Sequence, residues 1–242
     1  MIDGTLQPGA VTAMESTRRR AREMLPAIII TVLSMIQALA LELFWSRLQD
    51  SDYLWLGGTD ALVGWLQFAV LLLGIVEIWL LYISLMLRFS WLPSMADTTV
   101  PFLIGLMEFA LIDMIGPGDV GPWFVLLGML FGVVLAMTRV SLRKARNDPE
   151  NHWFFSEVPP QNWLDRLLDM GVVLLLVTLG VLLWFTQLGA WLAIGSLVIA
   201  LLALVWQMTV TWYYWSLLLR TGPGGENEDS RQAQPDRATP EN

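Results

Sequence analysis

Six long apolar segments are the feature that most restricts what this 242-residue sequence can fold into. A helix needs roughly 17 to 25 apolar residues to cross a hydrocarbon core of about 30 Å, and the segments are of about that length. They cover residues 25–45, 61–87, 100–115, 122–138, 168–186 and 190–219. With 55% hydrophobic and only 15% charged residues, the chain has more apolar surface than a soluble domain can hide. The sequence therefore predicts an all-α, polytopic membrane helix bundle with six transmembrane helices.

Basic residues predict the orientation, because Lys and Arg near the ends of spans are retained on the cytoplasmic side. With the N-terminus inside, all of the 14 Lys and Arg residues except Arg47 fall on the cytoplasmic side. Tryptophan favours both membrane interfaces, and its distribution agrees with this orientation. The expected outer set is Trp45, Trp55, Trp65, Trp123, Trp184 and Trp191, and the inner set is Trp91, Trp153, Trp163, Trp212 and Trp215. Both termini are therefore predicted to be cytoplasmic.

The segments that flank the membrane domain, residues 25–219, are polar. Residues 1–24 form a cytoplasmic N-terminal segment, and most of it lacks helical or strand periodicity, so we expect it to be loosely ordered. Residues 139–167 form a cytoplasmic loop, which opens with a basic cluster and suits the headgroup layer. Residues 220–242 are rich in Gly, Pro and carboxylates, a composition that predicts a disordered cytoplasmic tail.

The residue types that most enzyme chemistry requires are missing or isolated in this chain. It has no Cys, which excludes disulfides, thiol nucleophiles and Cys-ligated metals. Its one histidine, His152, has no second ligand or base at useful spacing. The sequence has no phosphate-binding loop, zinc-protease motif, nucleophile elbow or dinucleotide-binding loop. We predict no catalytic residue, no metal site, no cofactor and no nucleic-acid partner.

Four carboxyl groups within the predicted spans are the most informative polar residues. A carboxylate in a bilayer is costly unless it lies in a packed or watery interior, and no Lys, Arg or His lies at similar depth to pair with these. Glu77 and Glu108 are expected near mid-depth, and Glu42 and Asp113 nearer the outer face. The predicted ion or proton site comprises Glu77, Glu108, Glu42, Asp113, Gln67 and Gln207.

Helical projection, at about 100° per residue, indicates which polar residues share a face. Small and polar residues share one face in each of spans one, two and six, and we expect these faces to line the interior. They are Ala27, Thr31, Ser34, Ala38 and Glu42; Gln67, Gly74, Glu77 and Ser84; and Ser196, Ala200, Ala203, Gln207 and Thr211. In span four, Gly128, Gly132 and Ala136 recur every fourth residue, a spacing that lets a neighbouring helix approach closely. Glu108 and Asp113 lie about 140° apart and are not expected to share a face.

These patterns leave three classes of function open. The first is a proton- or cation-coupled carrier or channel that uses the mid-membrane carboxyl groups. The second is a non-transporting scaffold or subunit of a membrane complex, in which the same groups are static hydrogen-bonded packing. The third is an intramembrane enzyme acting on lipid, for which no nucleophile, base or metal cluster can be assembled. We expect a multi-pass protein of the bacterial cytoplasmic (inner) membrane, with the lipid bilayer, protons or monovalent cations, and a membrane protein or second copy as partners.

Overall fold

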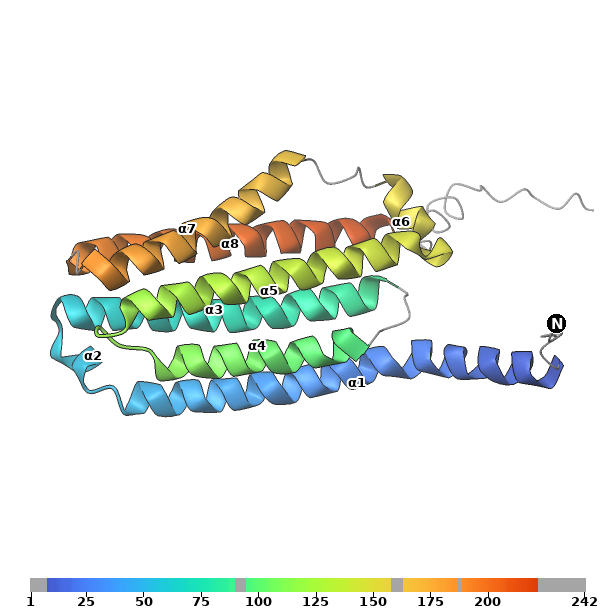
Figure 1. The fold of residues 1–242 in the computed structure, drawn as a ribbon, viewed down its shortest axis with the longest axis horizontal. Coiled ribbons are helices and arrows are strands. Elements are labelled where there is room, and N and C mark those ends of the chain that lie inside the picture. The colour runs from blue at the N-terminus through green and yellow to red at the C-terminus, as the bar shows by residue number, and fades with distance from the viewer. Residues whose placement is uncertain (1–7, 90–94, 158–162, 187–188, 222–242) are drawn as a thin grey trace, which may run out of the picture. The chain divides into compact units, whose positions relative to one another are not determined.

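The structure is a computed structural model that describes residues 8–89, 95–157, 163–186 and 189–221. Every regular element in these ranges is a helix, which confirms the all-α prediction (Figure 1). The elements are α1 (Pro8–Gln49), α2 (Tyr53–Leu56), α3 (Gly58–Arg88), α4 (Met95–Asp113), α5 (Val120–Asn147), η1 (Pro149–Asn151), α6 (His152–Glu157), α7 (Trp163–Thr186) and α8 (Ala190–Thr221). Most of the predicted tail, residues 222–242, lies outside the described residues.

Four of the described helices are long and apolar enough to cross a membrane. Their apolar parts are Met24–Gln49, Gly58–Leu87, Val120–Asn147 and Ala190–Tyr213. A further apolar stretch, Met170–Thr186 in α7, is shorter, and α4 is not among these helices. The protein is therefore a helical integral membrane protein, whereas six crossings and cytoplasmic termini remain predictions.

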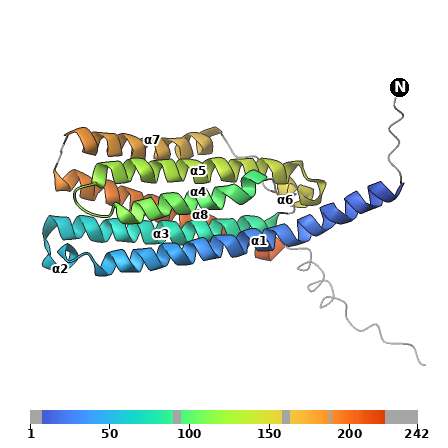
Figure 2. The same cartoon turned by 60° about the horizontal axis from the view of Figure 1, so that its bottom comes forward.

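Helix α1 packs against α3 through two side-chain contacts. The rings of Phe44 and Phe68 meet edge to face with centroids 5.0 Å apart. Further along, the indole Nε1 of Trp79 donates a hydrogen bond to Ser34 Oγ at 3.3 Å. From the first contact to the second, the residue number decreases in α1, from Phe44 to Ser34, and increases in α3, from Phe68 to Trp79. The two helices are therefore antiparallel and their register is fixed (Figure 2).

Helix α4 also packs against α1, and the two run in the same direction. Arg47 contacts Ile115 just after the end of α4, and Ile36 contacts Gly105 about two turns before that end. A Cβ on Gly105 would collide with the Cγ2 of Ile36. The absence of a side chain at Gly105 therefore lets α1 and α4 approach closely, as small residues do between membrane helices.

Helices α5 and α7 pack closely along most of their length. A Cβ added to Gly121 would lie 2.7 Å from the backbone N of Trp184, and one added to Gly180 would lie 2.6 Å from the backbone N of Val125. The backbones of the two helices are thus in contact at glycines contributed by both. Gly121 of α5 lies beside Trp184 of α7, whereas Val125, four residues later in α5, lies beside Gly180, four residues earlier in α7. This pair of helices is therefore antiparallel.

Two helices extend beyond the predicted spans into the predicted cytoplasmic segments. α1 begins at Pro8 and has 42 residues, or about 63 Å at 1.5 Å per residue, which exceeds the hydrocarbon core. Residues 8–24 are thus helical rather than loosely ordered. α5 continues to Asn147, so the loop expected at residues 139–167 begins as helix. Basic side chains in the last turn of α5 interact favourably with the helix C-terminus, so the helix need not end at the membrane surface.

The segment after α5 folds back onto the end of that helix. Asn151 Nδ2 donates to the carbonyl of Ala145 at 2.8 Å, which satisfies one of the backbone acceptors that a helix end leaves open. Phe155 of α6 stacks on Phe89 with ring centroids 5.4 Å apart, and the Arg146 guanidinium lies 5.0 Å from the Phe155 centroid. These contacts attach the predicted cytoplasmic loop to the ends of α3 and α5.

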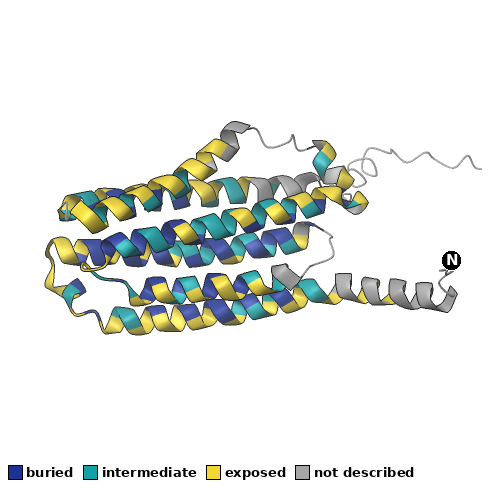
Figure 3. Ribbon diagram, in the orientation of Figure 1, coloured by how far each residue is buried: buried dark blue, intermediate teal, exposed yellow. Residues whose placement is uncertain are grey.

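Burial follows the faces that neighbouring helices share, and many large apolar side chains are exposed on the other faces (Figure 3). Exposed apolar side chains are what a lipid-facing surface requires. α8 crosses the boundary between two compact units, Met1–Leu204 and Val205–Asn242. Within the first unit, α8 buries the small residues Ala193, Ser196 and Ala200.

Candidate functional site

Glu108 is wholly buried on α4 and is held by a side chain of α1. Its relative exposure is 0%, and that of its partner Gln37 is 4%. Gln37 Nε2 lies 3.1 Å from both Oε1 and Oε2 of Glu108. The amide therefore donates to both oxygens, an arrangement that suits an ionised carboxylate, which can only accept. Gln37 Oε1 is also buried and has no hydrogen-bond partner among the described residues, so the pair retains one unused acceptor.

Glu77 is buried on α3, with 6% of its surface exposed. Neither of its carboxyl oxygens has a hydrogen-bond partner among the described residues. It belongs to a buried face that repeats every seventh residue, formed by Val63, Val70, Glu77 and Ser84. The Ser84 hydroxyl bonds to the carbonyl of Leu81 at 2.8 Å. Because a buried polar group without a partner costs about 1–3 kcal/mol, and more if it is charged, Glu77 lowers stability where it stands.

Glu77 and Glu108 lie at a similar depth but on different helix faces. The register of α1 and α3 places Glu77 within about 3 Å of Gln37 along the helix axis, at 1.5 Å per residue. Around α3, however, Glu77 lies about 180° from Phe68 and about 160° from Trp79, and both of these residues contact α1. Glu77 therefore faces away from α1, and it is not hydrogen-bonded to Glu108, because neither Glu77 oxygen has a partner among the described residues.

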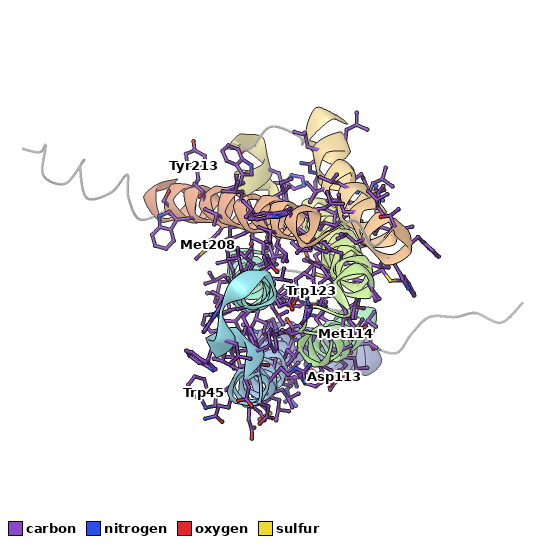
Figure 4. All side chains as sticks on the ribbon, turned by 90° about the vertical axis from the view of Figure 1, so that its left-hand side faces the viewer. Trp45, Asp113, Met114, Trp123, Met208 and Tyr213 are labelled. Atoms are coloured by element: carbon purple, nitrogen blue, oxygen red, sulfur yellow. The ribbon has the colours of Figure 1, made fainter. Side chains whose placement is uncertain are left out.

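Three of the other predicted site residues are exposed: Glu42 on α1, Asp113 at the end of α4, and Gln207 on α8. Gln207 belongs to the second compact unit. Figure 4, seen along the helices from the end that carries α2, shows Asp113 toward the edge of the first unit and Trp123 inside it. Glu108 and Asp113 thus differ in burial, as their separation around the helix leads us to expect.

The small and polar face of α1 is exposed rather than interior. Thr31, Ala38 and Glu42 are all exposed, whereas α1 buries Leu33 and Gln37 on another face. The prediction that this stripe lines the interior is therefore wrong for the single chain. Large apolar side chains of α1 lie on both sides of the helix, since Leu33 is buried whereas Met35 and Leu39 are exposed, so apolar size alone does not determine which face packs.

Gln67 lies at the end of α4, where side chains from three helices bind the backbone. Its Oε1 accepts a hydrogen bond from the N–H of Gly116 at 3.1 Å. Arg47 Nη2 donates to the carbonyl of Ile115 at 2.8 Å, and the indole of the fully buried Trp123 donates to a carbonyl in the last turn of α4 at 3.1 Å. A cation is favourable at a helix C-terminus, which accounts for Arg47 on the predicted outer side. Gln67 therefore holds the α4–α5 turn in place.

Tyr53 on α2 lies beside this turn. Burial raises the pKa of the Tyr53 phenol above its ordinary value of 10.0, while the Ser51 hydroxyl and the positive charge of Arg47 act in the opposite direction. The ring packs over Gly64 of α3, where an added Cβ would lie 2.7 Å from the Tyr53 Cε2 atom. The phenol is therefore neutral at physiological pH.

The predicted packing glycines face α7. A Cβ on Gly128 would lie 2.7 Å from the Cγ2 atom of Val177, and one on Gly132 would lie 3.6 Å from the Cγ1 atom of Val173. Ala136, one turn further on, is exposed. The close approach extends toward the start of α5 through Gly121.

Gln37 is the site residue that sequence reasoning missed. It occurs at helical spacing with Leu33, Ala40 and Phe44, and all four are buried. A glutamine within an otherwise apolar stripe of a span is itself a sign of an interior polar partner.

Among the residues that the structure describes, no three His, Cys, Asp or Glu side chains gather as a metal-binding group. No protein-family model matches the chain, and no curated protein or solved structure resembles it significantly.

Proposed function

We propose that the protein is a carrier or channel that passes protons or monovalent cations across a membrane, with Glu77 and Glu108 as its intramembrane acids. The observation that supports this most is Glu77, which is buried and has no hydrogen-bond partner for either carboxyl oxygen among the described residues. A leucine there would pack as well without the desolvation cost. Uptake and release of a proton or cation would explain why a carboxyl group occupies this position, whereas helix packing alone would not.

The two acids are assigned to separate positions on the transport path. Glu108 is bonded to Gln37 on α1, whereas Glu77 faces the opposite side of α3 at a similar depth. Static packing would pair each carboxyl group with a hydrogen-bond donor, and within the described part of the chain Glu108 has such a partner whereas Glu77 does not. The exposed acids Glu42 and Asp113 add negative charge that attracts cations toward the predicted outer side.

The test is ion flux into liposomes that contain the purified protein and an internal pH or cation indicator. We expect the wild type to exceed protein-free liposomes, and Glu77→Gln and Glu108→Gln each to lose most of this flux. Asp50→Asn, the same chemical change at an exposed acid outside the spans, should retain it. Wild-type liposomes no leakier than empty ones, across ions and pH values, would overturn the proposal.

A scaffold or subunit of a membrane complex is the second candidate, and the exposed face of α1 favours it. Thr31, Ala38 and Glu42 lie within the apolar span Met24–Gln49, and a carboxyl group there is costly to leave in contact with lipid. A partner helix or a second copy that covers this face would remove that cost. Purification in mild detergent should then recover a stoichiometric partner, which Glu42→Leu should change or release.

We also propose that the protein lies in the bacterial cytoplasmic (inner) membrane with both termini inside, as the basic residues indicate. The chain lacks Cys, so single cysteines can be introduced without a background. An impermeant thiol reagent applied to intact cells should label Asp52→Cys but not Ser230→Cys. Labelling of the second variant alone would reverse the orientation.

A further inference from the structure

We infer that the species bound at Glu108 is a proton rather than a metal cation, and that Gln37 is the positioning residue for both its unloaded and loaded states. This inference rests on the proposed function and names the substrate at one of its positions. It starts from the hydrogen bonds of Gln37, which use both oxygens of the carboxyl group.

In the unloaded state both oxygens of the Glu108 carboxylate already accept a hydrogen bond from one donor. Each oxygen accepts from Gln37 Nε2 at 3.1 Å, and both side chains are buried. A metal cation would have to compete with the amide for these oxygens and gather further oxygen ligands, since hard divalent cations take about six to eight in all. Ile36, beside Gln37, contacts Gly105 on α4 and adds only apolar surface. A proton requires one lone pair and no shell of ligands.

In the loaded state, when Glu108 is protonated, the same Gln37 amide can accept a hydrogen bond from the new O–H group. A hydronium ion from the aqueous phase gives up the proton, so one of its O–H bonds breaks and water is left, while an O–H bond forms on one Glu108 oxygen and the charge of the carboxyl group changes from minus one to zero. A protonated carboxyl group has one donor and one acceptor, as does the edge of a primary amide. Rotation of the Gln37 amide lets Nε2 donate to the carboxyl C=O while Oε1 accepts from the O–H. Oε1 has no hydrogen-bond partner among the described residues and is therefore available for this role.

The first test is the ion selectivity of wild-type liposomes. Proton flux is measured with an internal pH indicator while Na⁺, K⁺ or the large organic cation choline is the sole added cation. We expect the same proton flux in all three. Flux of Na⁺ or K⁺ without proton movement would overturn the inference and leave the proposed function standing. No flux of any ion would overturn the proposed function, and the second test then decides the inference on its own.

The second test is infrared spectroscopy of the Glu108 carboxyl group, assigned as the C=O band that Glu108→Gln abolishes. Gln37→Met keeps the side-chain size and removes the donor, so the band should move to higher wavenumber. Gln37→Glu can still donate from a protonated carboxyl and should move the band less, and it replaces Gln37→Met if that variant fails to fold. Gln67→Met, a change at a buried glutamine bonded to a backbone N–H, should leave the band in place.

Three infrared results would overturn the inference. In the first, no C=O band at any pH disappears in Glu108→Gln, which would mean that Glu108 takes no proton. The second is a band that Gln37→Met leaves unchanged, which would mean that Gln37 does not contact the protonated group. The third is a displacement of the band by Na⁺ or K⁺ at constant pH, which would assign a metal cation to the site.

Discussion

Replacement of Gly180 by alanine is the perturbation whose cost follows most directly from the packing of α5 and α7. The added Cβ would lie 2.6 Å from the backbone N of Val125 and 2.9 Å from the carbonyl O of Gly121. Favourable contacts between heavy atoms lie at about 3.5–4.0 Å, so the helices must separate by roughly 1 Å. Two of the three nearest atoms belong to the α5 backbone, which no change of rotamer can move.

Gly132→Ala is the matched control, because its Cβ would meet only the Cγ1 atom of Val173, at an ordinary 3.6 Å. Both substitutions gain the helix propensity of alanine over glycine, up to about 1 kcal/mol, and this gain cancels when the variants are compared. Overpacking of a close-packed interface typically costs about 1–3 kcal/mol. We therefore predict that Gly180→Ala unfolds with a free energy about 1–3 kcal/mol lower than that of Gly132→Ala.

The assay is reversible unfolding in mixed micelles, in which the fraction of denaturing detergent is raised and helix content and tryptophan fluorescence are followed together. Both variants are compared with the wild type under the same conditions. Equal unfolding free energies for Gly180→Ala and Gly132→Ala, or a more stable Gly180→Ala, would refute the reasoning that backbone contact limits this interface.

Three further predictions concern the end of α4 and its surroundings. Trp123→Phe leaves the buried Leu111 carbonyl without its donor, so it should cost about 1–3 kcal/mol in the same unfolding assay. Arg47→Met removes a charged hydrogen bond to the Ile115 carbonyl and should cost about 1.5–3 kcal/mol, with faster amide exchange in the α4–α5 turn as the local readout. Because the folded pKa of Tyr53 is raised above 10.0, its contribution to stability is complete below that pH and is lost as pH rises through the folded pKa. Tyr53→Phe should abolish that alkaline loss, and a phenol absorbance titration with no component above pH 10.0 would contradict the raised pKa.

The sequence predicts where the long helices lie along the chain, but it predicts only some of the faces that these helices bury. Long apolar runs predict where helices form, because length and hydrophobicity are local properties. Lipid is as apolar as a protein interior, so hydrophobicity does not distinguish the two sides of a span. The polar residues of α3 indicated its buried residues, since Gln67, Glu77 and Ser84 are all buried. The same rule gave the wrong face for α1.

The contacts of the candidate site depend on how helices far apart in the sequence are aligned. Gln37 and Glu108 are 71 residues apart, and their hydrogen bonds exist only because α1 and α4 run in the same direction in one particular register. That register depends on the close approach of Ile36 to Gly105, which no local pattern of either segment reveals. Sequence could therefore nominate Glu108 as a buried acid, but it could not supply its partner.

Proton flux through liposomes that contain Glu77→Gln tests the central claim most directly, because glutamine keeps the size of the side chain and removes its ability to take up a proton. If Glu77 lies on a transport path, the variant should fold as the wild type does, by helix content and elution volume, and should lose most of the wild-type flux. Equal proton and cation flux through Glu77→Gln and the wild type would contradict a transport role for this buried, unpaired acid.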